Sequence, residues 1–373
     1  ESLNNVLNDY SNIITSIKNN YEIYLPKNEY LQHVWGDIKN HLGDITLLDA
    51  GPGMGKTEMI KWLSNVKNKK ILMIQMFCST LKAKTEQDSG WETLYGNKKF
   101  VGGKNGTALT IDKFSKMSPY EIEIAQYDYI VIDESHLIFQ SGYRPVMPIA
   151  LELLTKINTQ KTKIILMTGT PMGEFLFLKD YITHIKVTRE ETRIKQFNTH
   201  IVKTNTEKMY FMCQNMARAI KEGKKILFPT NKGSKIKETI ERLVTYFLDD
   251  HPPIKVRYYK KSNEGSGFMK DINIDKTIKD IDILMCSTYL SVGVDIEEKY
   301  DFEIFYDEPW MPMEIEQWTN RLRKTDLYIQ FYISEESEDG ELKNIWSNNK
   351  LNLSLDATIV SIVSAFSKIA ISL

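Results

Sequence analysis

The chain has 373 residues, of which 42% are hydrophobic and 26% are charged, and its formal net charge at pH 7 is −1. This length and balance predict a globular protein of two or more domains, and the net charge excludes a uniformly basic nucleic-acid coat, although a basic groove is compatible with it. The three cysteines, Cys78, Cys213 and Cys286, are odd in number and far apart, which argues against a disulfide framework or a zinc cluster. No signal peptide heads the sequence, and no apolar run reaches the roughly 18 to 20 residues of a membrane span, so we expect a cytoplasmic protein with no membrane partner. The sequence begins with Glu1 instead of Met, which is typical of a trimmed fragment.

Apolar residues at helical spacing mark both ends of the chain, and they predict a helical extension over residues 1–24 and a helical tail over residues 341–373. The spaced residues are Leu3, Val6, Leu7, Tyr10, Ile13, Ile14 and Ile17 at the first end, and Ile359, Ile362, Val363, Phe366, Ile369, Ala370 and Leu373 at the second. We expect these helices to pack on the core, and contact with a protein partner or another copy of the chain is the alternative.

The stretch LLDAGPGMGKTEMIKWL, residues 47–63, places a glycine-rich turn between a predicted buried strand and a predicted helix. Residues without a Cβ let consecutive backbone N–H groups converge on phosphate oxygens at a helix N-terminus, where the helix dipole also favours negative charge. The pattern matches a phosphate loop with Ala50 in place of the usual first glycine, and a glycine-rich turn matched by chance is the alternative. It predicts that Lys56 reaches the β- and γ-phosphates of a nucleotide and that the Thr57 hydroxyl ligates Mg²⁺. The residues assigned to the nucleotide here are Gly51, Gly53, Gly55, Lys56 and Thr57.

Short apolar runs alternate with helical patterns along the whole chain, which indicates parallel α/β layers. The predicted strands are 45–50, 71–76, 129–132 and 163–168 in the first half, and 225–228, 255–259, 281–286, 302–307 and 328–333 in the second. The charged segment 187–197 lacks a sustained apolar stripe, so we place the interdomain connection there. The first domain then spans residues 25–186 and the second spans residues 198–340.

Two adjacent carboxylates, Asp133 and Glu134, follow the predicted strand 129–132. They would lie at the carboxyl edge of a parallel sheet, where ligands of open α/β folds bind and where the phosphate loop also opens. We expect Asp133 to hold Mg²⁺, usually through water, and Glu134 to orient and deprotonate the water that attacks the γ-phosphate. A solvated loop is the alternative for an acidic pair considered alone.

Five segments of the chain resemble, in order and rough spacing, motifs I, II, III, V and VI of superfamily 2 helicases of the DExH branch. They read GPGMGKT, DESH, MTGTPMG (167–173), STYLSVGVDI (287–296) and EQWTNRLRK (316–324). The resemblance covers about residues 28–335, and five ordered motifs are far more specific than any single one. It implies an α/β fold of two tandem RecA-like domains with parallel sheets, with ATP and Mg²⁺ bound between the domains and nucleic acid lying across both.

Motifs III and V depart from the usual family pattern in ways that keep their hydroxyl groups. The usual Ser-Ala-Thr of motif III is Thr168-Gly169-Thr170, whose hydroxyls can bond with His136. In motif V, Ser287 stands in the place of a threonine near the nucleic-acid backbone. The resemblance also implies that Gly293 and Asp295 face the nucleotide.

Motif VI is the least conventional, because its arginines are spaced as Arg321 and Arg323 and are followed by Lys324. This form, which begins at Gln317, is similar to that of viral origin-binding helicases and favours Arg321 and Arg323 as contacts to the γ-phosphate. Which of Arg323 and Lys324 serves as the second cation is left open, and a solvated helix face is the alternative for all three.

Weaker matches supply further assignments. Gln32, in a segment that resembles the one upstream of motif I, would contact adenine, with a surface glutamine as the alternative. Ser79 and Thr80 (motif Ia) and Thr110 (motif Ib) would contact the nucleic-acid backbone, although single hydroxyl residues in loops are common. Trp310 and Trp318 could stack on bases, and core packing is the alternative.

The motifs together predict an ATP-hydrolysing nucleic-acid helicase or translocase, with DNA favoured over RNA as its partner. The rich use of Lys, Asn and Ile indicates an AT-rich genome. The compact layout and the resemblance of motif VI favour a viral or phage protein that works in replication or recombination in the host cytoplasm. An ATP-switched initiator or sensor that binds nucleic acid without unwinding it is the alternative. A small-molecule kinase or GTPase ranks last, because it would not need the residues from 317 to 323.

Overall fold

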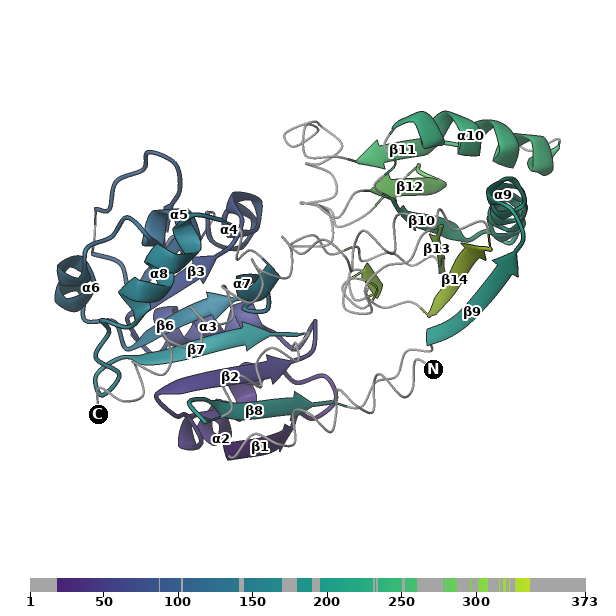
Figure 1. Cartoon of the computed structure of the whole chain (residues 1–373). Coiled ribbons are helices and arrows are strands. Elements are labelled where there is room, and N and C mark those ends of the chain that lie inside the picture. Colours follow the sequence, from purple (N-terminus) through teal and green to yellow (C-terminus); the bar gives the residue numbers. More distant parts are fainter. Residues whose placement is uncertain are drawn as a thin grey trace. The chain divides into compact units, whose positions relative to one another are not determined.

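The computed structural model describes residues 19–335 apart from short internal gaps at 87, 102, 141–143, 170–179, 190–194, 231, 233, 250–251, 260–277, 279, 287–295, 297–300, 308–314, 316–317, 320–321 and 323–325. The described residues form two compact units, which we call unit 1 (19–189) and unit 2 (195–335) (Figure 1). Each unit has its own parallel sheet and its own hydrophobic core.

Unit 1 is built on an eight-stranded sheet in the order β1-β8-β2-β7-β6-β3-β5-β4, in which every neighbouring pair is parallel. Its strands are β1 (Asn19–Tyr24), β2 (Ile45–Ala50), β3 (Ile71–Gln75), β4 (Trp91–Leu94), β5 (Gly106–Thr110), β6 (Tyr129–Asp133), β7 (Lys163–Thr168) and β8 (Thr183–Thr188). The residues of β2, β3, β5 and β6 are all buried, as expected for strands that are covered on both faces.

Helices connect these strands and cover the sheet. They are η1 (Leu31–Val34), α2 (Trp35–Asn40), α3 (Lys56–Asn65), α4 (Cys78–Thr85), α5 (Ile111–Phe114), α6 (Pro119–Ala125), α7 (Leu137–Gln140) and α8 (Val146–Leu154). Helix α3 buries Met59, Ile60 and Leu63 in the core of unit 1, which confirms the apolar face expected from their spacing. Helix α6 begins with a capping box, in which Ser118 and Glu121 bond to each other's backbone N–H groups.

Unit 2 has a six-stranded parallel sheet in the order β11-β12-β10-β13-β14-β9. Its strands are β9 (Lys195–Val202), β10 (Lys225–Pro229), β11 (Val256–Tyr259), β12 (Ile283–Cys286), β13 (Phe302–Tyr306) and β14 (Leu327–Ser334). Two longer helices, α9 (Asn205–Lys221) and α10 (Ser234–Leu248), pack against each other on one face of this sheet (Figure 1). Met212 and Met216 of α9 join Val244 of α10 in the core beneath them.

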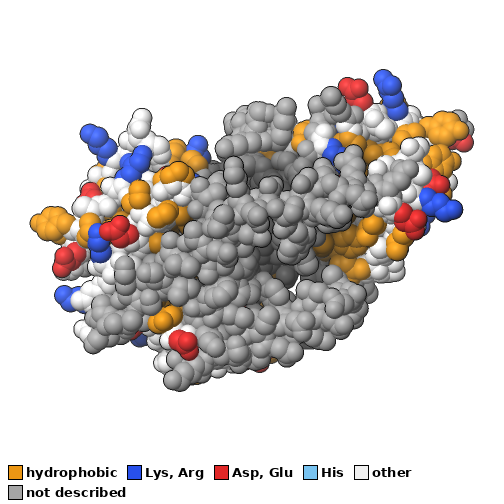
Figure 2. Space-filling model, viewed as in Figure 1, with side chains coloured by type: hydrophobic (Ala, Val, Ile, Leu, Met, Phe, Trp, Pro, Cys, Tyr) orange, Lys and Arg blue, Asp and Glu red, His pale blue; other side chains and the backbone are white. Residues whose placement is uncertain are grey.

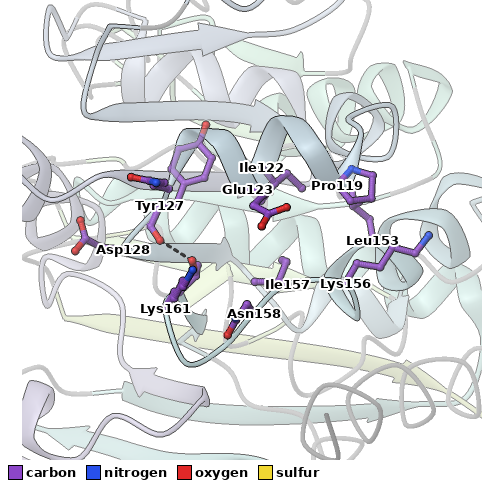
Figure 3. Close-up of a pocket in the computed structure, with 12 residues that line it drawn as sticks. Pro119, Ile122, Glu123, Tyr127, Asp128, Leu153, Lys156, Ile157, Asn158 and Lys161 are labelled. Carbon is purple, nitrogen blue, oxygen red and sulfur yellow. Dashed lines mark hydrogen bonds between the residues drawn. The ribbon is translucent and has the colours of Figure 1, made fainter. Parts of the chain in front are cut away.

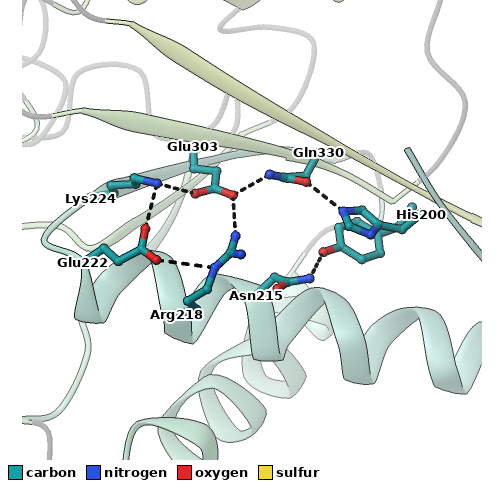
Figure 4. Close-up of polar contacts among 8 residues, drawn as sticks. His200, Asn215, Arg218, Glu222, Lys224, Glu303 and Gln330 are labelled. Atoms are coloured by element: carbon teal, nitrogen blue, oxygen red, sulfur yellow. Dashed lines mark hydrogen bonds and ion pairs between the residues drawn. The ribbon is translucent and has the colours of Figure 1, made fainter. Parts of the chain in front are cut away.

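A buried carboxylate lies within unit 2, between the sheet and α9 (Figure 4). Glu303 of β13 is 1% exposed, and it accepts hydrogen bonds from Gln330 (2.7 Å), Arg218 (3.2 Å) and Lys224 (3.3 Å). Gln330 Oε1 in turn lies 2.8 Å from Nε2 of His200, so the network continues to the edge strand β9. A buried charge of this kind needs such partners, and here they tie three strands to one helix.

The predicted fold class is confirmed: all nine predicted strands are present, in two parallel α/β sheets. Five further strands were not predicted, namely β1, β4, β5, β8 and β9. Residues 19–24, expected to belong to a helical extension, form strand β1, which pairs with β8 along its whole length; Ile23 is buried and Tyr24 is 60% exposed. The predicted linker 187–197 is too long at both ends, because its first two residues end β8 and its last three begin β9.

The remaining expectations concern the cysteines, membrane-spanning helices and the two ends of the chain. Cys78, Cys213 and Cys286 form no disulfide. Within the described residues, none of the helices has the length and apolar character that crossing a membrane requires. The predicted tail 341–373 and residues 1–18 of the predicted extension lie outside the described part of the chain.

Candidate nucleotide-binding site

The glycine-rich turn follows β2 and leads directly into α3, as the sequence predicts for a phosphate loop. Gly53 and Gly55 have positive φ angles of 77° and 84°, a conformation that other residues rarely adopt. The Lys56 ammonium donates to the backbone carbonyl oxygens of Ala50 (2.5 Å) and Gly51 (3.2 Å), so this side chain lies back over the loop. Burial lowers the pKa of Lys56, while the charges of Glu134 and Asp133 oppose that shift.

The segment that contains Gln32 lies against this loop. The backbone N–H of Leu31 donates to the carbonyl oxygen of Met54 at 3.0 Å. A Cβ at Gly55 would lie 3.0 Å from the Tyr30 ring, a contact tighter than most Cβ atoms make, and the positive φ of this residue also favours glycine. Gln32 is half-buried in the 3₁₀ turn between these contacts, next to the phosphate loop.

The Asp133 carboxylate is buried at the carboxyl end of β6, with 1% exposure. Its Oδ2 accepts hydrogen bonds from the Gln75 amide (2.7 Å) and the Lys84 ammonium (2.5 Å), and its Oδ1 accepts from the backbone N–H of Glu134 (3.0 Å). Burial alone would raise the pKa of Asp133, but the charge of Lys84 and the two side-chain hydrogen bonds hold this pKa below its ordinary value. The group is therefore an anion at neutral pH.

Glu134 follows in a left-handed backbone conformation with a φ of 51°, and its side chain is 19% exposed. Its Oε2 lies 3.7 Å from Nδ1 of the buried His136. The same Nδ1 lies 3.1 Å from Oγ1 of Thr168, at the end of the neighbouring strand β7. This confirms the expected contact between His136 and a motif III hydroxyl, and it connects the carboxylate to β7.

Gly169 explains why motif III has glycine at its middle position. A Cβ at this residue would lie 3.2 Å from Lys56 Nζ and 3.3 Å from the carbonyl oxygen of Ala50. Contacts this short are tighter than most Cβ atoms make, so the end of β7 and the phosphate loop meet at a point that glycine fits best.

The donor set fits a nucleotide with its magnesium ion. Mg²⁺ is typically held by one or two carboxylates together with substrate phosphates, and it keeps several waters. Asp133 is an anion at this sheet edge, and Thr57 lies in the first turn of the helix that follows the phosphate loop. Asp133 and Thr57 are therefore suited to hold the ion.

Two residues of this site were missed by sequence reasoning. Gln75 is a buried polar residue at the end of an otherwise apolar strand, and that interruption was a usable signal. Lys84 reaches Asp133 across 49 positions of sequence, and no local pattern indicates such a contact.

The predicted nucleic-acid contacts differ in their placement. Ser79 and Thr80 lie in the first turn of α4, which starts close to the carboxyl end of β3. The Thr110 hydroxyl instead accepts from the backbone N–H of Lys113 and caps α5, and the residue is 7% exposed. The contact of Thr110 with the nucleic-acid backbone stays a prediction. Trp318 is 1% exposed in the core of unit 2, which is the core-packing alternative.

The remaining predicted residues lie outside the described part of the chain. They are Ser287, Gly293, Asp295, Trp310, Gln317, Arg321, Arg323 and Lys324.

A separate cavity of about 510 Å³ in unit 1 lies at the opposite edge of the sheet, where β6 and β7 begin (Figure 3). Tyr127, Asp128 and Lys161 line it, and the Thr162 hydroxyl donates to the carbonyl oxygen of Tyr127 beside it. None of the predicted site residues lines this cavity, so we do not assign the cavity to the candidate nucleotide-binding site. On the coloured part of unit 1 that Figure 2 shows, hydrophobic side chains are interspersed with charged ones.

No protein-family model matches the chain, and no curated protein matches it either. Solved structures do. The chain is similar to the Escherichia coli DExH-box NTPase HrpB, with a TM-score of 0.60 and 11% identity over 91% of this chain and 48% of that one. It is similar to the DUF1998 helicase MrfA bound to DNA, with a TM-score of 0.61 and 12% identity over 86% of this chain and 51% of that one. The DEAD-box helicase Mss116 bound to ssRNA and UDP-BeF gives a TM-score of 0.56 and 13% identity over 93% of this chain and 90% of that one.

The chain thus spans about half the length of HrpB and of MrfA. Its two parallel α/β sheets match the tandem RecA-like domains of these structures. On this basis the chain has the fold of two tandem RecA-like domains that these helicase structures share.

Proposed function

We propose that the chain is a Mg²⁺- and ATP-dependent nucleic-acid helicase or translocase of the DExH type. The observation that carries the proposal is the convergence at one sheet edge of the phosphate loop with Lys56, the buried anion of Asp133, and the chain of contacts from Glu134 through His136 to Thr168. The fold and the order of the sequence motifs support the same assignment.

In this mechanism Lys56 holds the β- and γ-phosphates, Gln32 contacts adenine, and Thr57 and Asp133 hold Mg²⁺. The ion, when bound, neutralises charge that develops on the phosphates. Glu134 orients a water molecule and accepts its proton. His136 connects that carboxylate to Thr168, so a change in the bound nucleotide can alter the position of motif III.

Residues of unit 2 complete the proposal. Arg321 and Arg323 contact the γ-phosphate in the closed state, with Gln317 beside them, and Gly293 and Asp295 face the nucleotide. Ser79, Thr80 and Ser287 hold the backbone of the nucleic acid, for which DNA is favoured over RNA. The form of motif VI supports a viral or phage protein that acts in replication or recombination in the host cytoplasm.

The test is the ATP hydrolysis rate measured with no polymer, with single-stranded DNA, with duplex DNA and with single-stranded RNA. We expect strong stimulation by single-stranded DNA and no turnover by Lys56→Ala, whose fold is kept because the ammonium serves the phosphates and not the core. Turnover of the Lys56→Ala protein at the wild-type rate would remove the basis of the proposal.

An ATP-switched initiator or sensor is the second candidate. About 21 residues separate Asp295 from Gln317, which leaves little room for the strand-splitting hairpin that some DExH helicases carry there. Displacement of a labelled strand from a forked duplex separates the two candidates. A protein that hydrolyses ATP on DNA but displaces no strand would favour the second.

A further inference from the structure

Lys84 contacts the metal-side carboxylate from a helix that belongs to no nucleotide motif. Its Nζ lies 2.5 Å from Oδ2 of Asp133, and the lysine side chain is 21% exposed, whereas that of Asp133 is 1% exposed. Oδ2 also accepts from Gln75, and Oδ1 accepts from the backbone N–H of Glu134. Both carboxylate oxygens therefore already have donors, so a metal ion or its bound water has to share Asp133 with them.

The charges around Asp133 make this sharing unequal. The Gln75 amide and the Glu134 N–H are neutral, and Gln75 is fixed in a buried strand. Lys84 alone among these donors is a cation, and its partly exposed stem can turn toward solvent. Repulsion between a divalent ion and an ammonium a few ångströms away is strong at the dielectric of a protein interior. Lys84 is therefore the donor that a metal ion would displace from Asp133.

We propose that Lys84 competes with the metal ion for Oδ2 of Asp133, and that its release accompanies the binding of the metal and nucleotide. This inference rests on the proposed function. Helix α4 gives the exchange a second consequence, because Lys84 lies near its end and Ser79 and Thr80, the proposed contacts to nucleic acid, lie in its first turn. One short helix thereby links the metal side of the site to the polymer.

A purely structural ion pair predicts the opposite outcome from a competitor. Removing a structural partner would disorder Asp133 and weaken metal binding. Removing a competitor would strengthen metal binding, because the ion no longer has to displace an ammonium from Oδ2. The sign of the change in metal affinity therefore separates the two roles.

The test compares Lys84→Met with wild type by titrating Mn²⁺, as a stand-in for Mg²⁺, in the presence of ADP and measuring free Mn²⁺ by electron paramagnetic resonance. Methionine keeps the apolar stem and removes the charge. We expect Lys84→Met to bind Mn²⁺ about three- to tenfold more tightly than wild type. Lys82→Met is the matched control, because Lys82 is on the same helix and lies over the Tyr95 ring, away from Asp133, and it should leave the affinity unchanged.

Equal or weaker Mn²⁺ binding by Lys84→Met, in a protein whose wild type binds Mn²⁺ and ADP, overturns the inference and leaves the proposed function standing. Failure of wild type to bind Mn²⁺ with ADP overturns both.

The link through α4 has its own measurement, which is the affinity for a fluorescent single-stranded oligonucleotide with and without Mn²⁺ and ADP. The ratio of the two affinities should move toward one in Lys84→Met and stay at the wild-type value in Lys82→Met. An unchanged ratio in Lys84→Met would overturn the role assigned to α4.

Discussion

At the scale of single residues, Glu134 offers the most direct separation of binding from chemistry. Its carboxylate lies 3.7 Å from His136 and is partly open to solvent, so it can reach a water molecule. We expect Glu134→Gln to bind ATP, to lose hydrolysis and to hold a stable complex with nucleic acid, because the amide still orients water but cannot take its proton. Single-turnover hydrolysis and gel mobility shift measure the two effects. Loss of ATP binding by this variant would give Glu134 a structural role.

Two buried thiols predict how stability changes with alkaline pH. Burial raises the pKa of Cys213 to about 12 and raises the pKa of Cys286 well above its ordinary value. An unfolded thiol titrates near pH 8.5, so the native state keeps these protons while the unfolded state releases them. The free energy of unfolding should therefore be unaffected by these thiols below about pH 8.5 and fall above it.

The expected decrease between pH 7.5 and pH 9.5 is about 1.4 kcal/mol for each thiol, measured by urea unfolding. Cys213→Ala provides the control, because it should make the pH dependence shallower even if it lowers stability at every pH. A slope identical to that of wild type would show that Cys213 ionises with its ordinary pKa in the folded protein.

At the scale of elements, the Glu303 network of unit 2 predicts a clear difference between two glutamates. Glu303→Ala leaves Gln330 without its acceptor and opens a gap between β13 and α9, so we expect a loss of about 2 to 4 kcal/mol in the free energy of unfolding. Glu222 bonds Lys224 at the exposed end of the same network, where solvent weakens the pair, and Glu222→Ala should cost less than about 1 kcal/mol. Equal losses in urea unfolding would contradict the assignment of Glu303 as the centre of the network.

The sheet elements show what the sequence could and could not predict. Strands such as β2 and β6 are buried on both faces, so they read as unbroken apolar runs and were predicted with nearly correct ends. Edge strands such as β1 and β9 have one face open to solvent and carry polar residues, and the start of β9 was therefore taken for a linker.

The residues of the candidate site also divide into those that local sequence predicts and those that it does not. Two short contiguous segments contain Lys56 and Thr57, and Asp133 and Glu134. Their residue types indicate phosphate and metal binding, and the segments come together at one sheet edge. The contact between Lys84 and Asp133 depends on how α4 packs against the sheet. The residues next to Lys84 in the sequence do not encode that packing.

At the scale of the whole molecule, motif VI tests whether hydrolysis needs both units. If Arg321 and Arg323 contact the γ-phosphate in the closed state, Arg321→Ala and Arg323→Ala should lose turnover by about 10³-fold or more while ATP affinity changes little. Lys324→Ala should lose much less, because a compact ammonium cannot reproduce a bidentate phosphate contact. Steady-state ATP hydrolysis and equilibrium binding of a fluorescent ATP analogue measure the pair of effects. If Lys324→Ala is the most damaged of the three, the motif is shifted by one residue.

The backbone at Glu134 has a consequence for how this fold can change. A φ of 51° costs a residue with a side chain about 1 kcal/mol relative to glycine. Glu134→Gly would remove that steric cost together with the carboxylate. Local folding energy therefore favours glycine at this position, whereas the catalytic role proposed for Glu134 opposes it.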